Sequence, residues 1–182
     1  MKLGRLALLL AVALLAAGCG NDDGETTGTT TTTPTETTEL RVYWLLDGKV
    51  WPAAREVEPT VAVAESALEE LLAGPTEQES TDLEYTTAIP EGTEILEVTV
   101  DDGVAKVELS AELPDEPLAQ VVYTLTQFAT VESVDIQGNT VTRDDFEDVT
   151  PAILVESPLA FEEVTSPLHA PGTANTFEAN FQ

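Results

Sequence analysis

Hydrophobic and polar positions alternate with two different periods along this chain of 182 residues. Residues 40–46 are rich in β-forming side chains and end at Asp47-Gly48, which predicts a strand followed by a turn. Residues 64–72 carry apolar side chains at helical spacing, and Gly74-Pro75 ends this predicted helix. The period of two returns at 96–100 and 105–109, on either side of a turn. This pattern predicts a hairpin with one apolar face.

A second helix is predicted after Pro114, with Asp115 as its N-cap. Its apolar stripe consists of Leu118, Val121, Val122, Leu125 and Phe128. Residues 133–136 alternate again before Gly138-Asn139 and predict a last strand. The order β-α-β-β-α-β predicts an α+β fold, in which two helices pack on one face of a mixed β-sheet.

The N-terminus resembles a bacterial lipoprotein signal that ends before Cys19. Lys2 and Arg5 precede an apolar run at residues 6–17, which is shorter than the roughly twenty residues that a spanning helix needs. Ala16 stands where such signals usually have leucine. Cys19 is the only cysteine in the chain, so an intramolecular disulfide is impossible. We expect residues 1–18 to be removed and lipid to be attached to Cys19, which anchors the protein on the extracytoplasmic face of the cell membrane.

Residues 19–39 form a threonine-rich segment with an unbroken run at 29–33. Until Leu40 it holds no apolar side chain that a core could bury, so we predict a disordered tether between membrane and domain.

The charge of the chain excludes one class of partner. The sequence has 7 basic and 34 acidic residues and a net charge of −27. Without Lys2 and Arg5, five basic residues remain, and the net charge becomes −29 (5 minus 34). Because no basic stripe is present to bind phosphates, nucleic acid is not an expected partner.

Several blocks between residues 40 and 146 are distinctive as a set. They are Val42-Tyr43-Trp44, Leu72-Ala73-Gly74-Pro75, Ile89-Pro90-Glu91-Gly92, Asp102-Gly103-Val104-Ala105 and Tyr123-Thr124-Leu125-Thr126-Gln127-Phe128. Together they resemble the GerMN domain, a module of sporulation and germination proteins in bacterial envelopes. The resemblance implies a scaffold of sheet and helices that assembles or contacts a ligand, with no enzymatic activity and no cofactor.

A second resemblance covers residues 152–182, which are similar to the opening of a bacterial immunoglobulin-like domain. Val155-Glu156-Ser157-Pro158 and Gly172-Thr173-Ala174-Asn175 carry it, although Phe161-Glu162-Glu163 replaces the usual Pro-Gly turn. A complete sandwich needs roughly a hundred residues. We therefore expect an incomplete domain and a chain that is a fragment or a truncated product.

Two residues are candidate contacts for a ligand or partner. Arg55, which matches an arginine of the family, is either an ion-pair partner of the first helix or the contact for an anionic ligand. Thr124 also matches the family, and its hydroxyl either bonds back to the preceding helical turn or contacts a ligand.

No catalytic or metal-binding constellation is predicted. His169 is the sole histidine, and one histidine with a lipidated cysteine cannot make a zinc site. The pairs Asp101-Asp102 and Asp144-Asp145 lack the spacing of a calcium loop. The leading hypothesis is a lipid-anchored protein whose GerMN domain binds envelope proteins or copies of itself. The alternative is an extracytoplasmic receptor for a small ligand or cell-wall fragment.

Overall fold

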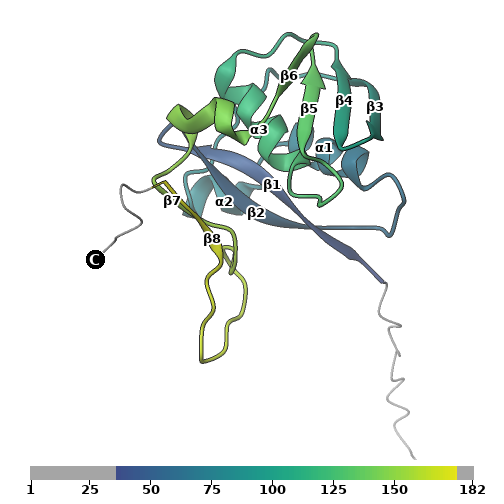
Figure 1. The fold of residues 1–182 in the computed structure, drawn as a ribbon. Helices are drawn as coiled ribbons and strands as arrows, with labels where there is room; N and C mark the ends of the chain where they lie inside the picture. The colour runs from purple at the N-terminus through teal and green to yellow at the C-terminus, as the bar shows by residue number, and fades with distance from the viewer. Residues whose placement is uncertain (1–35, 176–182) are drawn as a thin grey trace, which may run out of the picture. The chain divides into compact units, whose positions relative to one another are not determined.

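A computed structural model describes residues 36–175 and gives an α+β fold (Figure 1). The predicted signal, Cys19 and most of the predicted tether lie outside the described residues. The first strand, β1 (Thr38–Leu46), begins two residues before the predicted end of the tether. Thr38 and Glu39 belong to this strand because they pair with Val57 and Glu56. Backbone pairing thus extends β1 by two residues before its first apolar side chain, Leu40.

The first two strands, β1 and β2 (Lys49–Val57), form an antiparallel hairpin. Its predicted turn is confirmed, since Asp47 and Gly48 both have positive φ. Strand β2 was not predicted, because Pro52 and two alanines interrupt the β-forming pattern. Pro52 is tolerated because β2 has only β1 as a sheet neighbour and Tyr43, opposite Pro52, directs its own backbone groups away from β2.

Helix α1 (Val63–Ala73) is the predicted first helix, and Gly74 follows it with φ of 85°. A short second helix, α2 (Glu77–Asp82), was not predicted. It begins with a capping box in which the Thr76 hydroxyl accepts the Glu79 N–H and the Glu79 carboxylate accepts the Thr76 N–H.

The second sheet has four strands in the order β3-β4-β5-β6. They are β3 (Ile95–Asp101), β4 (Val104–Leu109), β5 (Ser133–Ile136) and β6 (Asn139–Val141). The sheet is mixed, since β4 and β5 are parallel and the other neighbours are antiparallel. The predicted 96–100 pairing is interrupted at Leu96 by a bulge between Ile95 and Glu97. Leu96 is therefore 61% exposed, and Ile95 packs against the core in its place.

Helix α3 (Asp115–Leu125) connects β4 to β5 and is buried nearly all round. Its N-cap is Pro114 and not Asp115, because Asp115 already has helical geometry and no side chain caps this end. The helix also ends before Phe128, which packs from the turn that follows. A helix without a solvated face must lie between two layers.

Those layers are the β1–β2 hairpin and the four-stranded sheet. α1 contacts β1 and β3, while α3 contacts β1, β5 and α1. The hydrophobic core fills the space between them and is centred on Val42, Trp44, Leu68, Val121 and Leu125. The predicted α+β class and mixed sheet are confirmed. The difference is that β2 is the only described strand that pairs with β1, so the helices also pack against a separate hairpin.

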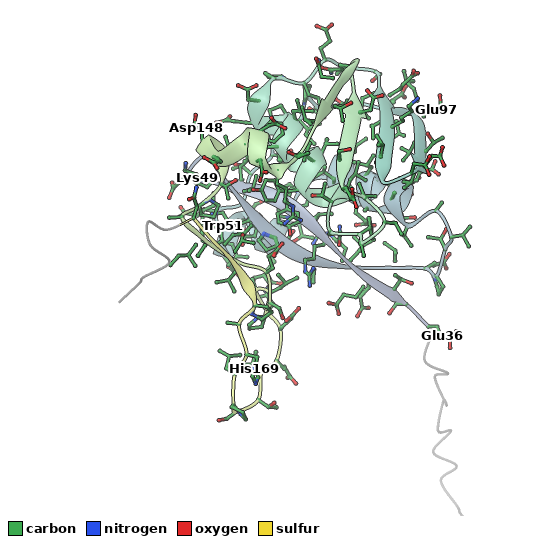
Figure 2. The ribbon with its side chains drawn as sticks, in the orientation of Figure 1. Glu36, Lys49, Trp51, Glu97, Asp148 and His169 are labelled. Carbon is green, nitrogen blue, oxygen red and sulfur yellow. The ribbon has the colours of Figure 1, made fainter. Side chains whose placement is uncertain are left out.

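After β6 the chain forms the 3-10 segment η1 (Arg143–Val149) and a short antiparallel ribbon of β7 (Ile153–Val155) and β8 (Gly172–Ala174). The connecting loop extends away from the helices, and His169 lies exposed on it (Figure 2). The immunoglobulin-like assignment of this region stays a prediction.

Gly172 lets β8 approach β7 closely, which leads to a prediction. A Cβ atom at position 172 would lie 2.1 Å from the backbone oxygen of Leu154. Gly172→Ala should therefore separate the two strands and leave the rest of the fold intact. Amide hydrogen exchange should accelerate in β7, while Thr173→Ala, an exposed control, should leave it unchanged. Normal protection of β7 in Gly172→Ala would contradict the expectation.

Candidate functional site

Arg55 lies on β2 and forms ion pairs with two helices. Its Nη1 and Nη2 donate to the Oε1 and Oε2 of Glu79, each at 2.7 Å. Its Nε lies 3.4 Å from Oε2 of Glu70 on α1, and Nη1 also donates to the Ala54 carbonyl at 2.8 Å. The side chains of Arg55 and Glu79 are only 12% and 7% exposed. This bidentate, nearly buried geometry is the strong form of an arginine–carboxylate pair.

Glu79 is ionised in this arrangement. Burial alone would raise the pKa of Glu79, but hydrogen bonds from Arg55 and from the Thr76 backbone outweigh it and lower the pKa. The guanidinium also lies 5.4 Å from the centre of the Trp44 ring. The ion-pair alternative accounts for these contacts. A hollow of about 290 Å³ adjoins Arg55 and Glu79 and has room for a small ligand. Contact between Arg55 and a ligand stays a prediction.

Thr124 is fully buried on α3, and its hydroxyl accepts the backbone N–H of Tyr43 at 3.2 Å. This bond reaches β1 and not the preceding helical turn. The residue that bonds back to its own helix is Thr126, whose hydroxyl donates to the Val122 carbonyl at 2.7 Å. Ligand contact by Thr124 stays a prediction.

Two glutamines of α3 and its C-terminal turn continue the same row of bonds along β1. Gln120 donates from Nε2 to the Tyr43 carbonyl at 2.9 Å, and its Oε1 accepts the Ala88 N–H at 2.9 Å. Gln127 accepts the Arg41 N–H at 2.7 Å and donates to the Arg41 carbonyl at 2.6 Å. Neither glutamine was predicted as a site residue. Their spacing of four and three residues around Thr124 was the available signal, because it places all three on one helical face.

A second cluster, which was also missed, forms around Arg143 of η1. The guanidinium lies 4.6 Å from the ring centre of Tyr123 and 5.5 Å from that of Tyr43. It donates to Oε1 of Glu156 at 2.9 Å and to the Thr126 hydroxyl at 2.7 Å. Because these residues come from β1, α3, η1 and the segment after β7, the cluster fastens the C-terminal ribbon to the domain.

Burial and charge set the protonation of this second cluster. Burial raises the pKa of Tyr43, whose hydroxyl donates to Glu156 Oε1 at 2.8 Å and stays protonated. Burial would also raise the pKa of Glu156, but hydrogen bonds from Arg143 and Tyr43 and the charge of Arg143 lower it. Glu156 is therefore an anion held between a cation and a phenol.

Between Glu36 and Asn175, no three His, Cys, Asp or Glu side chains gather closely enough to hold a metal ion. No helix in this part of the chain is long and apolar enough to cross a membrane. The buried polar residues of this part of the chain, Glu79, Gln120 and Thr124, bond to neighbouring elements, and none of the three pairs a nucleophile with a base.

A family model described as sporulation and spore germination, named Germane, matches residues 41–141, more than half of the chain. The chain belongs to this family. The resemblance to the GerMN domain is confirmed, and the match spans β1 to β6. Among curated proteins, no match to the chain is found.

Solved structures of GerMN domains are similar to part of this chain. The tandem GerMN domains of the sporulation protein GerM from Bacillus subtilis are 22% identical, with a TM-score of 0.48; the alignment covers 62% of this chain and 42% of that one. The first GerMN domain of the same protein is 24% identical, with a TM-score of 0.42, over 58% and 86% of the two chains. A candidate lipoprotein from Clostridium perfringens is 15% identical, with a TM-score of 0.40, over 63% and 93%.

Gln120 offers a direct test of the bonds between α3 and β1. Gln120→Leu preserves the size of the side chain but leaves the Tyr43 carbonyl and the Ala88 N–H without their buried partner. We expect the free energy of unfolding to fall by about 2–4 kcal/mol in urea titrations. Gln78→Leu, an exposed control on α2, should change it by less than about 0.5 kcal/mol. Equal effects of the two substitutions would contradict this role of Gln120.

The cluster around Arg143 should make the free energy of unfolding depend on pH in the acidic range. Because the folded-state pKa of Glu156 lies below its ordinary value of 4.5, its ion pair stabilises the protein above that value, and this contribution is lost as the pH falls through the lowered pKa. Glu156→Gln should lower the free energy of unfolding at neutral pH by about 1–2 kcal/mol.

The deficit of Glu156→Gln should then shrink in urea titrations as the pH falls below 4.5, because wild-type Glu156 becomes neutral as well. Glu163→Gln, at an exposed position, is the matched control. A deficit of constant size across this pH range would rule out the ion pair as its cause.

Proposed function

We infer that this protein is a lipid-anchored envelope protein whose GerMN domain contacts other envelope proteins or copies of itself and catalyses no reaction. The observation that carries the proposal is the family match over residues 41–141, which follows the export signal predicted for residues 1–18, directly before Cys19. The family description connects the domain with sporulation and spore germination and mentions no reaction.

The two polar clusters support a scaffold over a catalyst. The guanidinium groups of Arg55 and Arg143 are each neutralised by a partly or fully buried carboxylate of the same domain. The Thr124 hydroxyl is occupied by a backbone N–H. Groups that are consumed by internal bonds position elements of the fold and are not available to bind or activate a substrate.

Exposed apolar side chains support an interaction role. Val61, Leu96 and Val100 of the family domain are between 41% and 105% exposed. Partner surfaces are places where a folded domain leaves such side chains uncovered.

The alternative function is that of a receptor for a small ligand or a cell-wall fragment. The hollow of about 290 Å³ beside Arg55 favours it. Thermal stabilisation of the purified protein by soluble wall fragments would support this alternative over the adaptor.

Anchoring is tested by Cys19→Ala. We expect the wild-type protein to fractionate with the membrane and to incorporate labelled fatty acid, because several acyl chains hold a protein far more firmly than one. Cys19→Ala should appear in the medium, while Thr31→Ala in the threonine run should remain anchored. Retention of Cys19→Ala at the membrane would refute lipid anchoring through this residue.

The interaction role is tested by cross-linking the anchored protein in its native cells and identifying adducts by mass spectrometry. We expect a reproducible adduct with an envelope protein or with a second copy. A strictly monomeric protein without any envelope adduct would refute the role.

A further inference from the structure

Strand β3 has an open edge. It is the first strand of the four-stranded sheet, with β4 as its only sheet neighbour. The β3–β4 hairpin closes at the pair Asp101–Val104 through two residues with positive φ, Asp102 and Gly103. In a two-residue hairpin the closing pair is hydrogen-bonded, so alternate residues direct their N–H and C=O outward. These outward residues are Val98 and Val100.

No other backbone group of the described chain pairs with this edge. The contrast with β1 is clear, because side chains of α3 and its following turn bond the outer edge of β1 at Arg41 and Tyr43. β3 therefore offers a free row of donors and acceptors to another strand.

An apolar groove of about 300 Å³ runs beside this edge, and we call it the β3 groove. Its apolar lining includes Val61, Ala62, Val98, Val100, Phe128 and Val131. These residues come from the loop before α1, from β3 and from the turn after α3. Val100 is 41% exposed and Val61 fully exposed, although both are large apolar side chains. A strand added to β3 would direct every second side chain into this groove.

The other face of β3 is acidic. Glu97 is paired directly with Glu108 of β4, and both are exposed. Figure 2 shows Glu97 at the outer side of the sheet. Like charges placed opposite each other on a sheet are destabilising, and a cation beside them relieves the repulsion. An added strand would place its remaining side chains along this face, next to Glu97.

No lysine or arginine lines the groove, and its polar lining residues are Glu65 and Thr130. Arg55 and Arg143 are engaged in ion pairs elsewhere. An occupant of the β3 edge thus encounters a largely apolar groove on one side and Glu97, Thr99 and Asp101 of β3 on the other. The nearest basic side chain on that face, Lys106, is paired with Thr99 from β4, one strand further from the edge.

We propose that the open edge of β3 binds an extended, basic segment of a partner protein, in which apolar side chains alternate with lysine or arginine. The segment adds a strand to the sheet, its apolar side chains fill the β3 groove, and its cations lie next to Glu97 and Asp101 of β3. This inference rests on the proposed interaction role of the domain and specifies the partner class.

A second copy of this chain fits the edge poorly. Antiparallel pairing of two β3 strands would bring Glu97 and Asp101 of each copy close to acidic side chains of the other. Chains with a net charge of −27 also repel one another at a distance. Like-charge contacts select against such a partner, whereas a basic strand gains from the same carboxylates.

The test uses the full chain in detergent and a labelled synthetic peptide of alternating valine and lysine. Binding is measured by fluorescence anisotropy, and amide exchange at Val98 and Val100 should slow when the peptide binds. A peptide of the same sequence, N-methylated on the residues that would face β3, retains its charge but cannot pair with a strand. Its affinity should be lower by about tenfold or more.

Matched substitutions locate the site on the protein. Val100→Arg places a cation and extra bulk in the groove and should weaken binding by about tenfold. Val164→Arg makes the same change at an exposed position in the loop between β7 and β8, and should alter affinity by less than about twofold. Both positions are solvent-exposed, so both variants should fold, which circular dichroism checks.

The inference would be overturned if the N-methylated peptide bound as tightly as the unmodified one, or if Val100→Arg and Val164→Arg had equal effects. Either result would show that only general charge attraction holds the peptide. A dimer in sedimentation experiments that Val100→Arg abolishes would overturn it in favour of a second copy. These outcomes can be told apart from a failure of the proposed function. If the protein is anchored and cross-links to envelope partners but does not bind the peptide at β3, only this inference is refuted.

Discussion

The outer edge of β1 is bonded along its length by groups that do not belong to a strand. Gln127 bonds both backbone groups of Arg41, while Thr124 and Gln120 bond the N–H and C=O of Tyr43. The backbone of Thr86 does the same for Leu45. Buried backbone groups without partners are costly, so a two-stranded hairpin can enter the core only if its second edge is satisfied. The position of α3 follows from this requirement.

The two ionic clusters extend the same assembly outward. Arg55 on β2 joins the hairpin to α1 and α2 through Glu70 and Glu79. Arg143 joins Tyr43 of β1 and Tyr123 of α3 to the C-terminal segment through Glu156. Each cation is partly buried and matched by a carboxylate, which is the arrangement that burial of charge requires. The hairpin is consequently the element to which the three α-helices and the terminal ribbon attach.

Sequence patterns predicted the elements whose signals are local. β1, the turn at Asp47-Gly48, the end of α1 at Gly74 and the turn at Asp102-Gly103 all follow from neighbouring residues. Strand β2 could not be predicted in this way. Whether Pro52 fits into a strand depends on the orientation of Tyr43 opposite it, which the sequence does not reveal. The register of β3 at Leu96 also depends on a bulge that alternation cannot show.

The polar residues of the site were harder to predict because their partners are distant in sequence. Thr124 was identified through the family, but Gln120 and Gln127 look like an ordinary polar face until β1 is placed beside them. Arg55 could be narrowed to an ion pair or a ligand contact, and only the fold supplies Glu79 as its partner. The Arg143 cluster joins four segments, so no local pattern reports it.

The chain enters the domain through β1, which begins at Thr38, and this has a mechanical consequence. A force that pulls on the residues before Thr38 would act along the axis of β1. It would load the hydrogen bonds from β1 to β2 and to α3 in shear, so these bonds would resist the force together and would not break one at a time. The strand that would bear the force, β1, is thus the one that is hydrogen-bonded to the rest of the domain along both edges.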